Sequence, residues 1–271
     1  MIIGNKEFKD RGKTYIMGIL NVTPDSFSDG GRFMDADSAL FHVDQMIKDG
    51  CDIVDIGAES TRPGFVPVSE VEELERLIEP LRAIKEHFDI PVSVDTYKPG
   101  VAKTVIIEGA DMINDIRGLR FEESMAKVIA EGDVAYCVMH NRPMSEPYKN
   151  LIFDVINDIK ENLDIAKRYG ILDEKLIIDP GIGFGKSHEQ NLVMLKHVDE
   201  LSGFNRPLMI GTSRKSVIGK TLDLPVDQRE EGTCATTAYA VMKGCSFVRV
   251  HDVRANKRVI DMTEAILKSD E

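Results

Sequence analysis

The sequence repeats one pattern about eight times: a short apolar run, a polar cluster, and then a stretch with helical spacing. Such apolar runs are typical of parallel strands that are buried on both faces. The predicted strands lie at 15–20, 53–56, 92–94, 112–113, 134–138, 176–178, 208–210 and 246–248. Because parallel strands joined by helices point the same way, the polar clusters that follow them gather at one face.

Two architectures share this pattern, a closed barrel and an open doubly wound sheet. About eight repeats, with a polar cluster after every strand rather than only at a switch point, favour the barrel. The 271 residues suit a barrel, for which about 250 are typical, and no low-complexity stretch divides them. We therefore expect an α/β fold, a single-domain TIM (β/α)8 barrel over 1–271, in which residues 1–11 form a short hairpin or cover.

One helical segment carries a conflict between two local signals. Ser69 and Glu72 form a capping box, and an apolar stripe from Leu74 to Ile84 follows it at helical spacing. Pro80 falls within this stripe and has no N–H to donate. The sequence predicts a helix here that is kinked or interrupted at Pro80.

Composition narrows the class of partners. The net charge of −12 argues against nucleic-acid binding, which needs a basic surface. No apolar run approaches the ~20 residues of a membrane span, and no secretory signal is evident. The four cysteines form no CxxC pair and are expected to be free thiols. We expect a cytoplasmic protein, and the acidic charge does not exclude an anionic small substrate.

The glycine-rich segment Asp179-Pro-Gly-Ile-Gly-Phe-Gly-Lys-Ser187 resembles a phosphate loop only superficially. Pro180 stands where a Walker loop needs glycine, and Lys186 stands where a dinucleotide fingerprint needs its third glycine. The glycines instead indicate a close-fitting loop, with Asp179 offering a carboxylate and Phe184 an apolar face. An ordinary glycine-rich turn is the simpler alternative.

Polar residues at several strand ends suggest a site for a heterocycle. Asp95, Asn114, Asp179 and Lys215 combine hydrogen-bond acceptors and donors that suit an amino-pyrimidinone edge. Helix capping explains any one of the acidic or amide residues alone, but explains the whole set less well.

A second group of residues suggests an anion site. Ser213-Arg-Lys-Ser216 is expected to open a helix, and Arg249 and His251 alternate along a strand end, so both point the same way. Asn21, which begins a polar loop, could bind a hard metal through its carbonyl oxygen. This loop and a second one that begins at Thr61 are candidates for closure over a substrate, with solvated connectors as the alternative.

Taken together, these motifs resemble those of the dihydropteroate synthase family. The matching segments start at Met17, Asp55, Ser93, Ile113, Asp179, Ser213 and Arg249 and follow the family order, one per strand end. Two departures stand out: Ala58 replaces a common glycine, and Asn141-Arg142-Pro143 changes the loop after the fifth strand. The second departure puts the shape of that loop in doubt.

The resemblance implies a transferase of folate biosynthesis that joins 6-hydroxymethyl-7,8-dihydropterin diphosphate to p-aminobenzoate and is a target of sulfonamides. It implies a magnesium ion reached through Asn21, and a homodimer. The implied pterin-binding residues are Asp95, Asn114, Met139, Asp179 and Lys215, of which Asp95, Asp179 and Lys215 are the catalytic candidates. The implied diphosphate-binding residues are Asn21, Thr61, Ser216, Arg249 and His251. The implied p-aminobenzoate-binding residues are Phe27, Thr61, Arg62, Pro63, Phe184, Lys215 and Ser216.

Two other functions remain open at this point. A pterin-dependent methyltransferase shares the barrel and the Asp/Asn grip on the pterin, but lacks the diphosphate set of Arg249, His251 and the Asn21 loop. A catalytically silent barrel that binds pterin or a partner is the other alternative, and the apparently intact loops argue against it.

Overall fold

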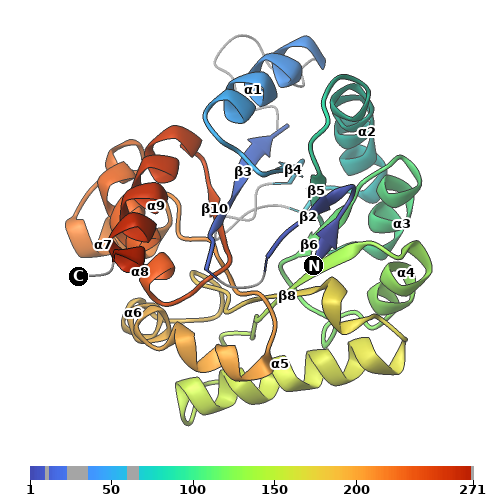
Figure 1. The fold of residues 1–271 in the computed structure, drawn as a ribbon. Helices are drawn as coiled ribbons and strands as arrows, with labels where there is room; N and C mark the ends of the chain where they lie inside the picture. The colour runs from blue at the N-terminus through green and yellow to red at the C-terminus, as the bar shows by residue number, and fades with distance from the viewer. Residues whose placement is uncertain (10–11, 23–35, 60–66, 270–271) are drawn as a thin grey trace.

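The computed structural model describes residues 1–9, 12–22, 36–59 and 67–269. Eight parallel strands form a ring with helices around its outside (Figure 1). The strands are β3 (Tyr15–Asn21), β4 (Ile53–Gly57), β5 (Val92–Asp95), β6 (Met112–Asp115), β7 (Ala135–Met139), β8 (Leu176–Asp179), β9 (Met209–Ile210) and β10 (Phe247–Val250).

The ring is closed, which confirms the barrel and rules out the open sheet. The hydrogen-bonded order is β8-β7-β6-β5-β4-β3-β10-β9. Between its two ends, Ile178 forms a parallel bridge with Leu208, and the Ile178 N–H donates to the Pro207 carbonyl at 3.0 Å. All eight strands therefore present their carboxyl ends at the same face.

Helices alternate with the strands, as the apolar periodicity predicts. They are α1 (Ala36–Lys48), α2 (Glu70–His87), α3 (Pro99–Ile107), α4 (Ser124–Gly132), α5 (Leu151–Arg168), α6 (His188–Lys196), α7 (Ser216–Leu222), α8 (Glu230–Met242) and α9 (Val253–Lys268). Short 3-10 turns lie at η2 (Asp173–Lys175), η3 (Val198–Phe204) and η4 (Val226–Gln228).

The predicted interruption at Pro80 is wrong. Helix α2 runs through Pro80 without a break, and Pro80 is buried on the same face as Leu77, Leu81 and Ile84. Ser69 caps the helix, because its hydroxyl accepts the Glu72 N–H at 3.2 Å. Burial of this apolar face against the barrel favours the helix on both sides of the proline and outweighs the missing hydrogen bond.

A small hairpin precedes the barrel, as expected for the first residues. Strands β1 (Ile2–Ile3) and β2 (Lys6–Glu7) pair antiparallel. The ring of Phe8, which follows β2, packs 4.9 Å from Tyr15 and 5.7 Å from Phe247, measured between centroids. Because Tyr15 and Phe247 begin their strands, the hairpin covers the amino-terminal end of the barrel.

The strands are buried on both faces, with two separate cores. Inward-facing side chains, among them Met17, Ile53, Met112 and Ile177, fill the barrel interior. Outward-facing side chains on the same strands pack against the helices. This alternation leaves the inward positions at the carboxyl ends of the strands for polar groups. No helix among the described residues has the length and apolar character needed to cross a bilayer.

Candidate active site

The polar residues at the strand ends belong to the strands themselves. The observed strands β5, β6, β8 and β10 extend one or two residues beyond the predicted ones, so Asp95, Asn114, Asp179 and Arg249 lie within them. Each stands two residues after an inward-facing residue of its strand and therefore also faces the interior. The extension places these four side chains around the carboxyl end of one barrel.

Arg249 connects two carboxylates across the barrel. Its Nε donates to Asp55 Oδ2 at 2.6 Å, and its Nη2 donates to Asp95 Oδ2 at 2.7 Å. Asn114 Nδ2 also donates to Asp55 Oδ2, at 3.2 Å. Four strands, β4, β5, β6 and β10, are thus joined by one network of charged and polar groups.

Asp179 and Lys215 lie next to Arg249 at the carboxyl end of the barrel. The Asp179 Oδ1 accepts the Gly181 N–H at 2.7 Å, and Lys215 Nζ donates to the Ile182 carbonyl at 2.7 Å. A Cβ added at Gly211 would lie 3.7 Å from Lys215 Nζ and 3.9 Å from Asp179 Oδ2. The Cβ added at Gly211 would also lie 3.8 Å from the Arg249 Cβ. The side chains of Asp179, Lys215 and Arg249 therefore converge next to Gly211.

An apolar wall completes this part of the site. Met139 at the end of β7 packs with Tyr97 and Ile116, and the half-buried Phe184 packs against this cluster. The Lys215 Nζ lies 4.7 Å from the centroid of the Phe184 ring. The arrangement offers a flat ligand an apolar face beside acidic and amide hydrogen-bonding groups.

Apart from Arg249, the residues predicted to bind the anion that the structure describes lie nearer the rim. His251 Nδ1 and the Ser213 hydroxyl are 2.9 Å apart, and Ser213 Oγ accepts the His251 N–H at 3.1 Å. Ser216 is exposed at the start of α7. Asn21 ends β3, and its Oδ1 would lie 3.7 Å from a Cβ added at Gly57, which is itself paired with Asp95. Phe27, Thr61, Arg62 and Pro63 lie outside the described residues.

Burial sets the ionisation of the central groups. It raises the pKa of Asp95 to about 7 against the opposing effect of Arg249, and the neighbouring Asp55 raises it further. Burial also raises the pKa of Asp179, although Lys215 opposes the shift. Burial lowers the pKa of Lys215 to about 8, while the charge of Asp179 acts in the opposite direction. Acids and bases that titrate near neutrality in one cleft are typical of catalytic sites.

His140 does not join this group, although it follows a strand whose end does. Met139 faces inward, so His140 faces the helix layer, where its Nε2 lies 3.1 Å from Asp158 Oδ2. Its Nδ1 lies 2.9 Å from Lys186 Nζ, which also donates to the carbonyls of Gly181 and Phe184 at 3.0 and 3.2 Å. Lys186 thus stabilises the glycine-rich loop through hydrogen bonds to its backbone carbonyls.

The unusual loop after β7 is held in place by hydrogen bonds. Asn141 Nδ2 donates to the Ile116 carbonyl at 3.0 Å, and Arg142 Nη2 lies 2.7 Å from Asp158 Oδ2. The other departure, Ala58, is buried, and its carbonyl accepts Arg76 Nη1 at 2.8 Å.

Two acidic residues were not among the predicted site residues. Asp55 has no exposed surface and pairs with Arg249 inside the barrel. Glu59, just after β4, accepts the Tyr97 hydroxyl and Lys98 Nζ, both at 2.7 Å, and the Val68 N–H at 2.9 Å. A carboxylate within the apolar run 53–56 was a signal for Asp55, since a strand buried on both faces has no solvent for a charge.

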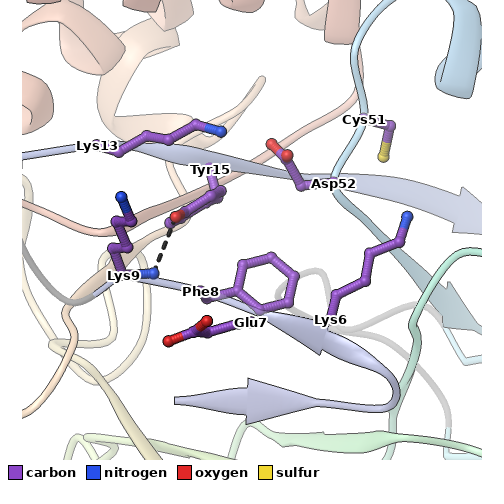
Figure 2. Close-up of a pocket in the computed structure, with 8 residues that line it drawn as sticks. All are labelled: Lys6, Glu7, Phe8, Lys9, Lys13, Tyr15, Cys51 and Asp52. Carbon is purple, nitrogen blue, oxygen red and sulfur yellow. Dashed lines mark hydrogen bonds between the residues drawn. The ribbon is translucent and has the colours of Figure 1, made fainter.

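A cavity of about 360 Å³ lies at the opposite end of the barrel, under the hairpin (Figure 2). Its lining residues are Lys6, Glu7, Phe8, Lys9, Lys13, Tyr15, Cys51 and Asp52. The Tyr15 hydroxyl accepts the Lys9 N–H at 2.9 Å in this cavity. None of the predicted site residues lines it, and barrel enzymes place their chemistry at the carboxyl ends of the strands. We therefore assign the candidate active site to the carboxyl end.

The fold and this site define a (β/α)8 barrel with ionisable groups gathered at the end where barrel enzymes keep their active sites. A model of the pterin binding enzyme family matches residues 17–251. A dihydropteroate synthase of Clostridium beijerinckii is 55% identical over 99% of this chain and 100% of its own length. One of Bacillus subtilis is 47% identical over 94% of this chain and 89% of its own length.

Solved structures that are similar to this chain are also dihydropteroate synthases. A Clostridium difficile dihydropteroate synthase, described in the presence of pteroic acid, superposes with a TM-score of 0.92 at 45% identity, covering 96% of this chain and 100% of the other. A Xanthomonas albilineans dihydropteroate synthase with 4-aminobenzoic acid has a TM-score of 0.90 at 36% identity, covering 95% and 94%. The chain belongs to the pterin binding enzymes and, among them, to the dihydropteroate synthase family.

Proposed function

We propose that this protein joins 6-hydroxymethyl-7,8-dihydropterin diphosphate to p-aminobenzoate, giving 7,8-dihydropteroate and diphosphate. The observation that carries this proposal is the convergence of Asp95, Asn114, Asp179, Lys215 and Arg249 at one end of the barrel of a family member. The solved relatives described with pteroic acid and with 4-aminobenzoic acid support the same substrates.

The pterin ring is assigned to the buried part of the site. Asp179 accepts hydrogen bonds from ring N–H groups, Asn114 supplies its amide, and Lys215 donates to the ring. Met139 and Phe184 provide the apolar face, which is consistent with their packing around Tyr97. p-Aminobenzoate is assigned to the space beside Phe184, Lys215 and Ser216. The other residues predicted to bind it lie outside the described residues: Phe27, Thr61, Arg62 and Pro63.

The reaction breaks the bond between the pterin methylene carbon and the diphosphate oxygen, which leaves with the electron pair. Ionised Asp95 stabilises the positive charge that spreads into the ring, and Arg249 and His251 offset the charge on the departing diphosphate. The lone pair of the arylamine then forms the new carbon–nitrogen bond. Its extra proton passes to water or to diphosphate, so no strong protein base is required.

Magnesium is assigned to the diphosphate through Asn21. No group of three or more His, Cys, Asp or Glu side chains could hold a metal ion within the described ranges. The Asn21 carboxamide is nevertheless a hard oxygen donor at a strand end beside Asp95, and Mg²⁺ commonly binds through one or two protein oxygens plus substrate phosphates. When bound, the ion supplies positive charge to the leaving diphosphate.

We also assign the protein to the cytoplasm. Its four cysteines are all free, as is usual in a reducing compartment.

We further assign the protein to a homodimer. Apolar side chains that could contact a second copy are exposed on adjacent helices, among them Met242 on α8, and Met262 and Ile266 on α9. Light scattering after size exclusion tests the dimer, and a monomer at working concentration contradicts it.

The decisive test is release of diphosphate with both substrates and magnesium, with and without p-aminobenzoate. Release that requires the arylamine and is competed by a sulfonamide supports the synthase, and no release with both substrates supports a silent pterin binder. Asp95→Asn is expected to reduce turnover about 10²–10³-fold, the scale for losing one charge-stabilising group. Phe184→Leu is the control and is expected to affect turnover far less.

A further inference from the structure

Asp55 is the most deeply buried charged group of the site and has no role in the reaction as proposed above. It has no exposed surface, and it stands in register with Ser93, whereas Asp95 is in register with Gly57. Asp55 therefore lies one inward-facing layer below Asp95, at the floor of the site.

The two carboxylates that hold Arg249 are not equivalent. Within the described residues, Arg249 is the only cation paired with Asp55, through Nε at 2.6 Å, and Asp55 Oδ1 is buried without a hydrogen-bond partner. The Asp95 side chain is 8% exposed and is also attracted by Lys215. Removing Arg249 from Asp55 would leave a buried charge uncompensated, whereas Asp95 keeps a second cation and some solvent.

The contacts with Asp55 and Asp95 use one N–H on Nε and one on Nη2 out of the five that a guanidinium carries, so a diphosphate does not have to compete for the contact of Nε with Asp55. Nε points to the floor and Nη2 to the rim, so Nη2 is the donor that can turn to a ligand entering from the carboxyl end. We propose that Asp55 is a positioning residue that retains Arg249 through Nε while Asp95 releases Nη2 to the substrate diphosphate. This inference rests on the proposed function, since it takes Arg249 to bind the diphosphate.

The retained contact has two consequences for the site. It keeps the guanidinium plane aimed at the leaving group, because a planar fork held at Nε has little freedom to turn away. It also links the diphosphate-binding residue Arg249 to the pterin-binding residue Asn114, because the same Asp55 Oδ2 accepts a hydrogen bond from Asn114 Nδ2. Asp55 thus aligns one residue assigned to the diphosphate and one assigned to the pterin.

The test uses Asp55→Asn, which preserves size and removes the charge. The KM for the pterin diphosphate is expected to rise by about tenfold or more, the scale for a lost charged hydrogen bond, while the KM for p-aminobenzoate stays within about twofold. Ser93→Ala is the matched control at the same level of the barrel, and both KM values should be unchanged in it. Calorimetric titration with inorganic diphosphate should show the same loss of affinity in Asp55→Asn without any turnover.

A double-mutant cycle separates positioning from a general structural effect. In an Arg249→Gln background, Asp55→Asn should add little to the loss of affinity for inorganic diphosphate, because that part of its effect passes through Arg249. An equal rise in both KM values, an equal loss of diphosphate affinity in the Arg249→Gln background, or unchanged diphosphate affinity overturns the proposal.

Two further measurements test the role of Asp55 if the variant does not fold or if the parent protein is inactive. If Asp55→Asn does not fold, Arg249→Lys keeps the charge but removes the Nε donor, and a parental KM for the pterin diphosphate in it overturns the proposal. If the parent protein releases no diphosphate, the proposed function fails on its own, and the calorimetric comparison still decides whether Asp55 holds Arg249 for the anion.

Discussion

Gly181 is the residue at which the backbone geometry of the site is most demanding. Its φ is +69°, and a Cβ added there would lie 1.8 Å from the backbone carbonyl oxygen of His140. Gly170, after α5, has a φ of +83° and nothing within 4 Å of an added Cβ. Gly181→Ala and Gly170→Ala therefore share the left-handed backbone penalty of about 1–2 kcal/mol, and only the first adds a clash.

The cost of the clash follows from the contacts that it disturbs. Relief requires a shift of more than 1 Å, because real Cβ contacts essentially never fall below 3.0 Å. Such a shift disrupts the 2.7 Å hydrogen bond from Gly181 N to Asp179 Oδ1 and the 3.0 Å one from Lys186 Nζ to the Gly181 carbonyl. At about 1.5–3 kcal/mol for each charged hydrogen bond, Gly181→Ala should cost about 3–6 kcal/mol more than Gly170→Ala.

Urea unfolding followed by circular dichroism measures both variants against the parent. The expected difference is a large share of the about 5–15 kcal/mol that stabilise a typical domain. Gly181→Ala should also raise the KM for the pterin substrate, because Asp179 loses the donor that orients it. Unfolding free energies within about 1 kcal/mol of each other in the two variants would refute the steric reasoning.

Three other outcomes are expected. Because the pKa of Asp95 is raised to about 7 by burial and the ionised form is the one proposed to act, kcat should fall as pH drops from roughly 8 to roughly 6; a flat profile of diphosphate release contradicts this role. Glu59→Gln should lower the unfolding free energy by about 1.5–3 kcal/mol, since it weakens the charged hydrogen bond with Lys98 in a buried cluster; a thermal-melt midpoint equal to that of the parent argues against it. Removal of magnesium with a chelator should stop diphosphate release and readdition should restore it, whereas full activity without the metal excludes the assignment to Asn21.

The barrel was predictable because its signals are local and repeated. Each predicted strand appears in the structure, and the polar clusters follow in the expected order. The boundaries were less accurate: the runs were ended at the last apolar residue, so Asp95 and Asp179 were placed after strands to which they belong. An inward-facing polar residue at a strand end breaks the apolar pattern without ending the strand, because its backbone still pairs with its neighbours.

The predicted interruption at Pro80, one of the two outcomes expected there, failed for a related reason. A local rule assigned the proline a break, and the buried face of α2 supplied packing that the rule does not include. His140 shows the converse case, because it follows a strand whose end lines the site, whereas the alternation of β7 turned its side chain toward Asp158. Pro80 is tolerated because it lies on the buried face of α2, and His140 is excluded from the site because it points to the helix layer. In both cases the direction of the side chain mattered more than the residue type.

The sequence by itself determined the class of fold, the order of the motifs and the family, since these depend on periodicity and on residue types at fixed spacing. Only the tertiary structure decided which groups pair with which. The contacts of Arg249 with Asp55 and Asp95 join residues separated by 194 and 154 positions, and no local pattern encodes that choice. It arises when the barrel closes, because burial then requires each charge to find a partner among the side chains that the ring brings together.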